Sequence, residues 1–329
     1  MKAELPWAKC GNEWNTGNCS ANTTQTNGSD IVLTPAEEYF YNKVLNISTG
    51  IDEPGGFQVE LVATLAAAWF IVFLVLIKGV GSLGKVVYFV AIFPYVVLTA
   101  LLINGLLLEG AIDGIIYYIT PDWNQLLDIK VWRDAAVQTF YSLSACTGGL
   151  IAMSSYSDFH NNVRRDAIAI PLISLATSIY AGLVIFTVLG FMANFKGVDI
   201  SEVAEQGPGL VFVVYPEGIS RMPLAPFWAI IFFFMMVTLG FGTQFSIMES
   251  VMSGIFDVYP TFFRASTWRM IAFRALFCGG SFLIGLSMVT RGGMYVLNVV
   301  DESIGGIVLI ILGIVEFLTI HWVYVTIEK

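Results

Sequence analysis

Long apolar stretches alternate with short polar ones along this sequence, after a polar N-terminal segment over residues 1–56. A helix needs about 20 mostly apolar residues to cross the hydrocarbon core of a membrane. Stretches of that length predict seven membrane-spanning helices, near 57–77, 86–108, 134–156, 167–192, 226–256, 268–289 and 294–325. The pattern therefore predicts two parts, a polar segment over 1–56 and a transmembrane core over 57–329.

The stretch 134–156 has a polar centre that a plain membrane helix lacks. Small and hydroxyl residues crowd its middle, at Ser142, Ser144, Thr147, Gly148 and Gly149. Each glycine costs roughly 1 kcal/mol relative to alanine in a helix, and hydroxyl groups can satisfy the backbone groups that an unwound segment frees. One interpretation is a helix broken near the membrane midplane, which exposes backbone groups to a bound ligand. The alternative is a face of small residues for close helix packing.

Composition places the chain among membrane proteins. It is 56% hydrophobic and only 12% charged over 329 residues, whereas soluble domains carry about 25% charged residues. The net charge of −9 comes with no basic patch for nucleic acid. The two histidines, His160 and His321, lie far apart without a nucleophile pattern, and no metal-ligand or redox spacing is present. The sequence therefore predicts an all-α integral membrane protein that is not an enzyme and has no organic cofactor.

The N-terminal segment carries the signals of an extracellular, glycosylated loop. N-x-S/T sequons fall at Asn18, Asn22, Asn27 and Asn46. Such sequons are glycosylated on surface loops of chains that enter the secretory route. Asn18 directly precedes Cys19, and crowding there would leave that sequon unused. Cys10 lies in the same segment as Cys19, and an oxidising compartment would let the two pair.

Positive charge predicts the orientation, because Lys and Arg are concentrated in cytoplasmic loops. Three short loops on one side of the predicted spans carry basic pairs, Lys78 with Lys85, Arg164 with Arg165, and Arg264 with Arg269. This side is opposite the sequons. The N-terminus is therefore predicted to be extracellular and the C-terminus cytosolic, in a multi-pass protein of the plasma membrane.

Seven spans with a glycosylated outer N-terminus also describe a G-protein-coupled receptor. The sequence lacks an acidic-Arg-Tyr motif at the end of the third span and an N-P-x-x-Y motif in the last span. The acidic loop over 193–222, which contains G-P-G and is expected to form a short re-entrant cap, is also unlike a receptor loop. A receptor or channel is therefore disfavoured.

Several strings of the sequence are similar to one family of transporters. They are G-K-V-V-Y-F-V-A-I-F-P-Y at 84–95, Y-S-L-S-A-C-T-G-G-L-I-A-M-S-S-Y at 141–156, E-V-A-E-Q-G-P-G-L-V-F-V-V-Y-P-E at 202–217 and S-M-V-T-R-G-G-M-Y-V at 287–296. In this order they resemble the neurotransmitter sodium symporters, which have the LeuT fold, and S-L-S-A with G-G-L resembles the glycine transporter branch. The resemblance implies sodium- and chloride-coupled symport of a small neutral amino acid such as glycine, by alternating access.

The resemblance also implies that the chain covers part of the family's twelve-helix plan. The seven spans would be helices 4 to 10, which makes a partial LeuT-fold bundle with one broken helix. Helix 1, the other broken helix of the family, supplies about half of each ion and substrate site and lies outside this sequence. We therefore expect the chain alone not to transport. A second hypothesis is a truncated member that associates with or regulates a full-length relative. The segment 1–56 resembles the family's second extracellular loop, which implies a Cys10–Cys19 disulfide.

The substrate pocket that the resemblance implies combines the broken helix with the span that faces it. Its residues are Tyr141, Ser142, Leu143, Ser144 and Thr147, with Thr243 and Ile247 across from them. Exposed carbonyls and small hydroxyls suit the ammonium and carboxylate of an amino acid. Thr147 stands where the family has Phe and the glycine transporters have Trp, so we expect space for a larger or more polar solute.

Two sodium sites are implied, and hard cations prefer oxygen ligands. The second site would use the Leu239 carbonyl and the Thr243 hydroxyl, next to Gly242, where many members have Asp or Thr. The first site would use Ser142 and Ser174, which stands where the family has Asn. Serine is shorter than asparagine and has no amide carbonyl, so the first site departs from the family pattern.

Chloride and two gates complete the sites that the resemblance implies. Chloride would lie among the neutral donors Gln138, Ser142 and Ser178. Asp301 matches the acid of the outer gate and Asp257 the acid of the inner gate, each of which pairs with an arginine outside this sequence. The alternative is that neither acid acts as a gate and that both are ordinary solvated acids at helix ends.

Overall fold

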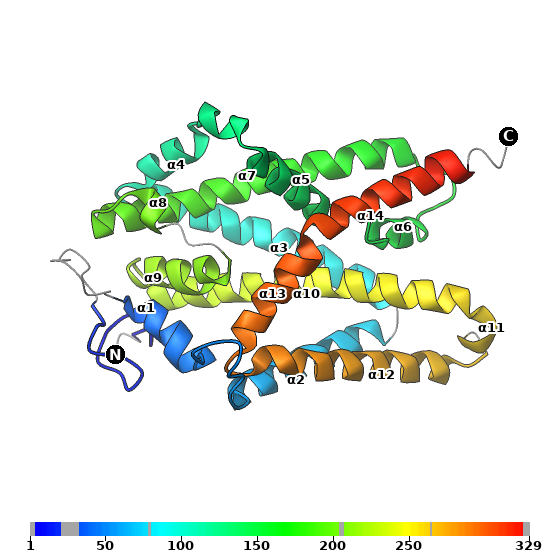
Figure 1. The fold of residues 1–329 in the computed structure, drawn as a ribbon, viewed down its shortest axis with the longest axis horizontal. Coiled ribbons are helices and arrows are strands. Elements are labelled where there is room, and N and C mark those ends of the chain that lie inside the picture. The colour runs from blue at the N-terminus through cyan, green and yellow to red at the C-terminus, as the bar shows by residue number, and fades with distance from the viewer. Residues whose placement is uncertain (1–3, 21–32, 78–79, 204–206, 264, 325–329) are drawn as a thin grey trace.

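The computed structural model describes residues 4–20, 33–77, 80–203, 207–263 and 265–324 (Figure 1). Within these ranges the secondary structure is helical, apart from isolated β-bridges between Cys19 and Leu33 and between Phe57 and Thr290. The structure therefore confirms the predicted all-α class.

Six helical segments of the described chain are long and apolar enough to cross a membrane. They are α2 (Val59–Leu76), α3 (Val80–Leu106), α7 (Val163–Lys196), α10 (Ala225–Val258), α12 (Thr267–Gly285) with the 3-10 turn η4 (Leu286–Val289), and α13 (Gly293–Gly305) with α14 (Ile307–Leu318) and η5 (Thr319–Tyr324). Each lies close to a predicted span. The remaining predicted span, 134–156, is divided between α5 (Ile129–Ser142) and α6 (Gly149–Ser154).

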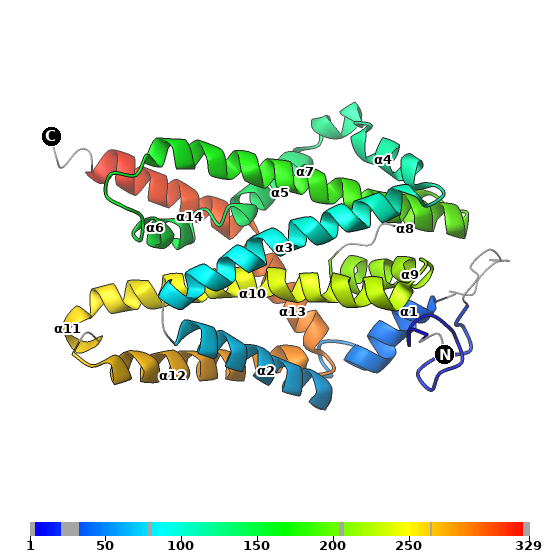
Figure 2. The same cartoon turned by 180° about the vertical axis from the view of Figure 1, so that it is seen from behind.

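α10 is the central helix of the bundle. It packs against α3 on one side and α2 on the other, while α12 packs on α2 and α7 packs on α3 (Figure 2). One core cluster joins α3, α7 and α10 around Leu101, Val188 and Phe232, and a second joins α2, α10 and α12 around Leu76 and Phe245.

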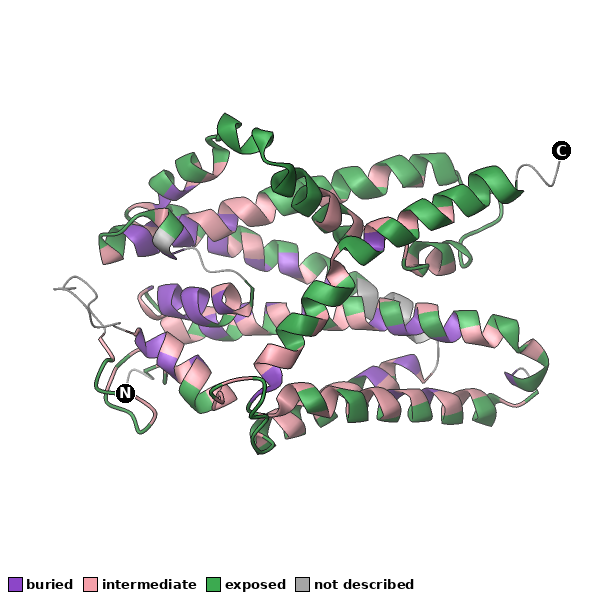
Figure 3. Cartoon of the chain, viewed as in Figure 1, coloured by how far each residue is buried: buried purple, intermediate pink, exposed green. Residues whose placement is uncertain are grey.

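Most other helix surfaces are apolar and exposed. Apolar residues on α14 in particular are exposed along most of its length (Figure 3). Exposed apolar side chains at this density are unusual for a soluble domain, and they suit helices that face lipid or further protein within a membrane.

The N-terminal segment lies at one end of the bundle. Cys10 and Cys19 form the expected disulfide. The carboxylate of Glu38, buried on α1 (Pro35–Glu38), accepts hydrogen bonds from the Thr16 backbone N–H at 3.0 Å, the Thr16 hydroxyl and the Asn15 amide at 2.9 Å. These bonds fix the disulfide loop on α1, and α1 continues directly into a π-helical turn, η1 (Tyr39–Leu45).

The expected cap is a short helical unit at the same end, made of η3 (Leu210–Val214) and α9 (Tyr215–Ser220). Glu217 on α9 is buried and forms ion pairs with Lys196 at 3.2 Å and Arg221 at 3.4 Å. The Trp7 indole N–H donates to the Pro216 carbonyl at 3.0 Å. The cap is thereby attached both to the end of α7 and to the N-terminal segment.

Of the four sequons, the structure describes two. Asn18 is exposed, and Asn46 ends η1 with a φ of 47°. Asn22 and Asn27 lie outside the described residues. The segment then returns to the bundle, where the Ser48 backbone N–H donates to the Arg291 carbonyl at 3.2 Å.

Short helices occupy both ends. α4 (Ala111–Ile119), η2 (Trp123–Leu127) and α8 (Ile200–Val203) connect the long helices, with α4 packed closely on α7. α11 (Pro260–Phe263), α6 and the end of α14 lie toward the end of the bundle opposite α1, α8 and α9 (Figure 1).

Candidate functional site

The stretch that the sequence singles out is a helix broken in the middle. α5 ends at Ser142 and α6 begins at Gly149, and residues 143–148 between them form turns. Ser144, Cys146 and Gly148 have φ angles of 50°, 64° and 74°. Left-handed residues cannot continue a right-handed helix. The broken-helix interpretation is therefore confirmed.

The break differs in detail from the expectation based on two adjacent glycines. Gly148 is left-handed, but Gly149 is the first residue of α6, and the other left-handed residues are a serine and a cysteine. The Thr147 hydroxyl donates to the Ser144 carbonyl at 2.8 Å. A hydroxyl thus satisfies a backbone group that the unwinding frees, as a break inside a membrane requires.

The structure brings together the two residues expected at the first sodium site. The hydroxyl oxygens of Ser142, at the end of α5, and Ser174, on α7, lie 3.0 Å apart. Gln138 and Ser178 each lie one turn from these serines, and residues four apart share a helix face. The donors expected for chloride therefore belong to the same pair of helix faces as the Ser142–Ser174 contact, and both Gln138 and Ser178 are exposed.

The residues expected at the second sodium site lie next to one another on α10. The Thr243 hydroxyl oxygen is 3.4 Å from the Leu239 carbonyl oxygen, to which it donates. Gly242 has a steric reason to be glycine, because a Cβ there would lie 2.7 Å from Val90 Cγ1 of α3. A side-chain ligand at this position would require the Val90 side chain to shift.

The substrate residues divide between the break and α10. Tyr141, Ser142, Leu143, Ser144 and Thr147 belong to the break or to its edge, whereas Thr243 and Ile247 are exposed on α10. α6 packs on α10, and a Cβ on Gly149 would lie 3.9 Å from the Ser250 hydroxyl oxygen, one turn beyond Ile247. The structure thus places the two halves of the set on neighbouring elements, and no interaction joins their side chains among the described contacts.

The two gate candidates are exposed acids on different elements. Asp301 lies on α13 and Asp257 lies one residue before the end of α10, close to α11. Their predicted pairing with arginines stays a prediction.

Sequence reasoning missed a second break beside the first. The last span is interrupted at Gly306, between α13 and α14. On α14, Glu316 lies beside the Cys146 thiol of the unwound segment. The adjacent glycines in S-I-G-G-I were the available signal.

A buried ion pair joins α10 to α12. Glu249 is 3% exposed and Arg274 is 8% exposed, and their Oε1 and guanidinium nitrogen lie 3.8 Å apart. Arg274 also donates to the Ile77 carbonyl at the end of α2, at 3.2 Å. Local sequence patterns do not identify Arg274 as the partner of Glu249, because the two residues lie on different helices.

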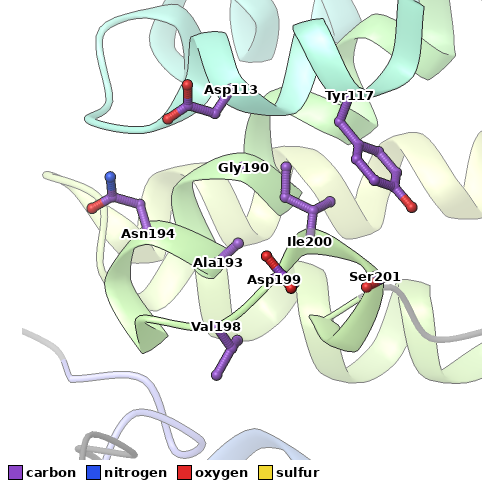
Figure 4. A pocket seen from close by; sticks show the side chains of 9 residues that line it. All are labelled: Asp113, Tyr117, Gly190, Ala193, Asn194, Val198, Asp199, Ile200 and Ser201. Carbon is purple, nitrogen blue, oxygen red and sulfur yellow. The ribbon is translucent and has the colours of Figure 1, made fainter. Parts of the chain in front are cut away.

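A cavity of about 450 Å³ lies away from all of these residues. It is formed where α4 meets the end of α7 and the turn into α8, and it is lined by Asp113, Tyr117, Gly190, Ala193, Asn194, Val198, Asp199, Ile200 and Ser201 (Figure 4). It shares no residue with the expected substrate or ion sites.

Comparison with known sequences gives a consistent result. The pattern of the family described as "Sodium:neurotransmitter symporter family" matches residues 1–328. The chain is 44% identical over 354 residues to "Sodium- and chloride-dependent glycine transporter 2" of Xenopus laevis, a match that covers 97% of this chain and 44% of the relative.

Two further relatives carry different substrates in their names. The "Sodium- and chloride-dependent creatine transporter 1" of Mus musculus is 45% identical over 333 residues, which covers 97% of this chain and 52% of the relative. The "Sodium- and chloride-dependent GABA transporter 2" of Mus musculus is 44% identical over 326 residues, which covers 98% and 54%. The chain therefore spans about half the length of the curated relatives that it matches.

Proposed function

Because the chain belongs to the sodium:neurotransmitter symporter family, we propose that it forms the central part of a sodium- and chloride-coupled symporter for a small zwitterionic solute. The observation that carries the proposal is the unwound segment 143–148, which adjoins the Ser142–Ser174 contact. An interrupted helix in a membrane presents carbonyls and a half-helix N-terminus to a bound solute. Transport would follow by alternating access.

The ion sites follow from the chemistry of the side chains. For sodium, Ser142 and Ser174 supply oxygen ligands at the first site, and Leu239 and Thr243 supply them at the second. For chloride, Gln138, Ser142 and Ser178 supply neutral donors, so that no fixed positive charge has to be buried with the anion.

The substrate class is set by what the named relatives have in common. Glycine, creatine and GABA each carry a carboxylate and a cationic nitrogen group, but they differ in length. Thr147 favours a solute larger than glycine, because the threonine side chain is short and its hydroxyl already donates to the Ser144 carbonyl. The break at Ser144 and Gly148 then offers backbone groups to both ends of such a zwitterion.

A second hypothesis is that this chain associates with a full-length relative. The observation that favours it is the exposure of Gln138, Ser142 and Ser178, since polar groups at membrane depth need protein partners. In the relatives, the remaining half of the chain is available to cover them. A relative could supply the same cover in trans, and co-purification of the 329-residue chain with a tagged full-length transporter tests this.

The test of transport is uptake of labelled glycine, creatine and GABA into cells that express the full-length protein. We expect uptake of at least one of the three to stop when choline replaces sodium and to fall when gluconate replaces chloride. Thr243→Val should raise the sodium concentration for half-maximal uptake by about tenfold, the equivalent of roughly 1.4 kcal/mol. The matched control is Thr64→Val, which removes another exposed hydroxyl that donates within its own helix.

Uptake that does not depend on sodium would contradict the proposal. An equal effect of Thr243→Val and Thr64→Val would contradict the assignment of the second sodium site while leaving transport in place.

A further inference from the structure

The last membrane span is two helices rather than one. α13 ends at Gly305, and α14 begins at Ile307 in a different direction (Figure 1). Gly306, between them, has φ −84° and ψ −149°, so it leaves the helical conformation. A Cβ on Gly306 would lie 2.6 Å from the Glu302 carbonyl oxygen, a distance that a side chain cannot occupy. Gly306 is therefore glycine for a steric reason.

The neighbouring glycine has no such reason. A Cβ on Gly305 would lie 3.8 Å from the ring of Tyr141, which is an ordinary van der Waals contact. The pair thus gives one position where alanine forces the backbone to change and one, directly adjacent, where alanine fits.

The change of direction places α14 against the unwound segment of the first broken helix. A Cβ on Gly313 would lie 2.7 Å from the Cys146 sulfur and 3.2 Å from the Phe140 ring, so the α14 backbone approaches that segment closely. One turn further, Glu316 lies beside the Cys146 thiol. Both contacts are made to a residue whose φ is 64°.

Cys146 needs such support. A non-glycine residue in the left-handed region costs about 1–3 kcal/mol and persists only where the surroundings hold it there. Ser144 is also in the left-handed region, and the Thr147 hydroxyl holds it there by donating to its carbonyl. Cys146 is instead held by α14. α14 therefore helps to hold the unwound segment in its conformation, although it lies more than 150 residues later in the sequence (313 − 146 = 167).

We propose that Gly306 is a positioning residue for transport: its break turns α14 onto residues 143–148 and so holds the solute-binding segment in its unwound conformation. The effect on transport rests on the proposed function, whereas the structural part of the inference does not. The structural part is that α14 covers Cys146 only when the chain can bend at Gly306.

The experiment uses the Cys146 thiol as a native reporter. Of the four cysteines, Cys10 and Cys19 form the disulfide and Cys278 is buried, so the full-length protein with Cys278→Ala leaves Cys146 as the free thiol of this part of the chain. The rate of Cys146 modification by a methanethiosulfonate reagent is measured in membranes, with surface biotinylation as the measure of folding and export.

We expect Gly306→Ala to increase the modification rate about fivefold, as loss of one packing contact would. Gly305→Ala is the matched control and should stay within about twofold of the parent. Equal rates in Gly306→Ala and the parent, or an equal increase in Gly305→Ala, would overturn the proposal. If Gly306→Ala does not reach the surface, the modification rate of Gly313→Ala is measured instead, since its methyl group pushes α14 away from Cys146 directly. An unchanged modification rate in Gly313→Ala would also overturn the proposal.

Uptake measurements distinguish a positioning role of Gly306 from general damage to the transporter. Gly306→Ala should raise the KM for solute and the half-saturating sodium concentration, with a smaller change in maximal uptake per transporter at the surface. Gly305→Ala should raise neither the KM nor the half-saturating sodium concentration. If neither the parent nor any variant transports, the proposed function fails, while the thiol rates still decide whether Gly306 positions α14.

Discussion

Hydroxyl side chains have two distinct roles at the broken helix. The Thr147 hydroxyl completes the unwound backbone by donating to the Ser144 carbonyl, so it belongs to the framework of the segment. The hydroxyls of Ser142 and Ser174 instead face each other 3.0 Å apart across two helices. Hydroxyl oxygens suit a hard cation as ligands, and this is the role that we propose for the pair, so single substitutions at these positions are informative.

Thr147→Trp tests the size of the solute site in the full-length protein. The indole fills the space beside residues 143–148, so we expect uptake to narrow towards glycine. The loss for creatine and GABA should be at least about tenfold, as expected when a site rejects a solute by steric overlap. Competition by unlabelled solutes against labelled glycine measures this. Equal inhibition by the larger solutes before and after the change would contradict the pocket assignment.

Ser174→Asn tests the first sodium site. Asparagine adds an amide carbonyl beside the Ser142 hydroxyl, so we expect the sodium concentration for half-maximal uptake to fall by about fivefold, or roughly 1 kcal/mol. Ser303→Asn, on the exposed surface of α13, is the control. An unchanged sodium dependence in Ser174→Asn would place the first sodium ion elsewhere.

At the scale of helices, α10 is attached to its neighbours by both apolar and ionic contacts. Its core contacts with α3 and α2 hold the bundle, and the Glu249–Arg274 pair attaches it to α12. Arg274 also reaches the Ile77 carbonyl at the end of α2, where a cation is favoured by the helix dipole. One arginine thus links three helices at a point where water is scarce.

Arg274→Met should destabilise the protein strongly, because it leaves the Glu249 carboxylate buried without its cation. Removal of one partner of a buried pair costs about 3–5 kcal/mol, which a thermal melt of the purified protein in detergent would measure. The double variant with Glu249→Met should recover most of the loss, because no uncompensated charge remains. Arg269→Met, an exposed arginine on the same helix, is the control. If it destabilised as much as Arg274→Met, the pair would not be the cause.

On the scale of the whole molecule, the two ends of the bundle are built differently. One end is covered by the disulfide loop, α1 and the cap. The Trp7 indole joins the cap to the N-terminal segment, and the Glu217–Lys196 ion pair joins it to α7. The other end carries α11, the loop after α6 and the end of α14 (Figure 1). We propose that the covered end is extracellular, since it holds Asn18, Asn46 and the disulfide, while α7 and α12 begin at the other end with Arg164, Arg165 and Arg269.

Glycosylation tests this orientation. Treatment of the protein from cell membranes with an N-glycosidase should increase its gel mobility, because at least one of the four sequons meets the secretory lumen. The quadruple Asn→Gln variant at 18, 22, 27 and 46 should already migrate at the treated position. Single restoration of each asparagine then identifies the sites that are used. We expect Asn18 to stay unmodified because Cys19 next to it is in the disulfide. A parent protein that the enzyme does not shift would contradict the outward orientation.

The sequence by itself determined most of the elements and the position of the first break. Apolar length gave the spans, and the small and hydroxyl residues of 142–149 predicted a break where the structure has one. These are local properties, because helix length and helix interruption depend on neighbouring residues. The similarity of strings to one family supplied the roles that we propose for Ser142 and Thr243.

Only the tertiary structure decided how the elements support one another. The partner of Glu249, the steric need for Gly242 beside Val90 and the approach of α14 to Cys146 all join residues that are distant in sequence. No local periodicity encodes such contacts, since they depend on which helix faces meet after packing. The left-handed φ of Cys146 is the clearest case, because its local sequence disfavours that conformation and a helix from the other end of the chain holds it.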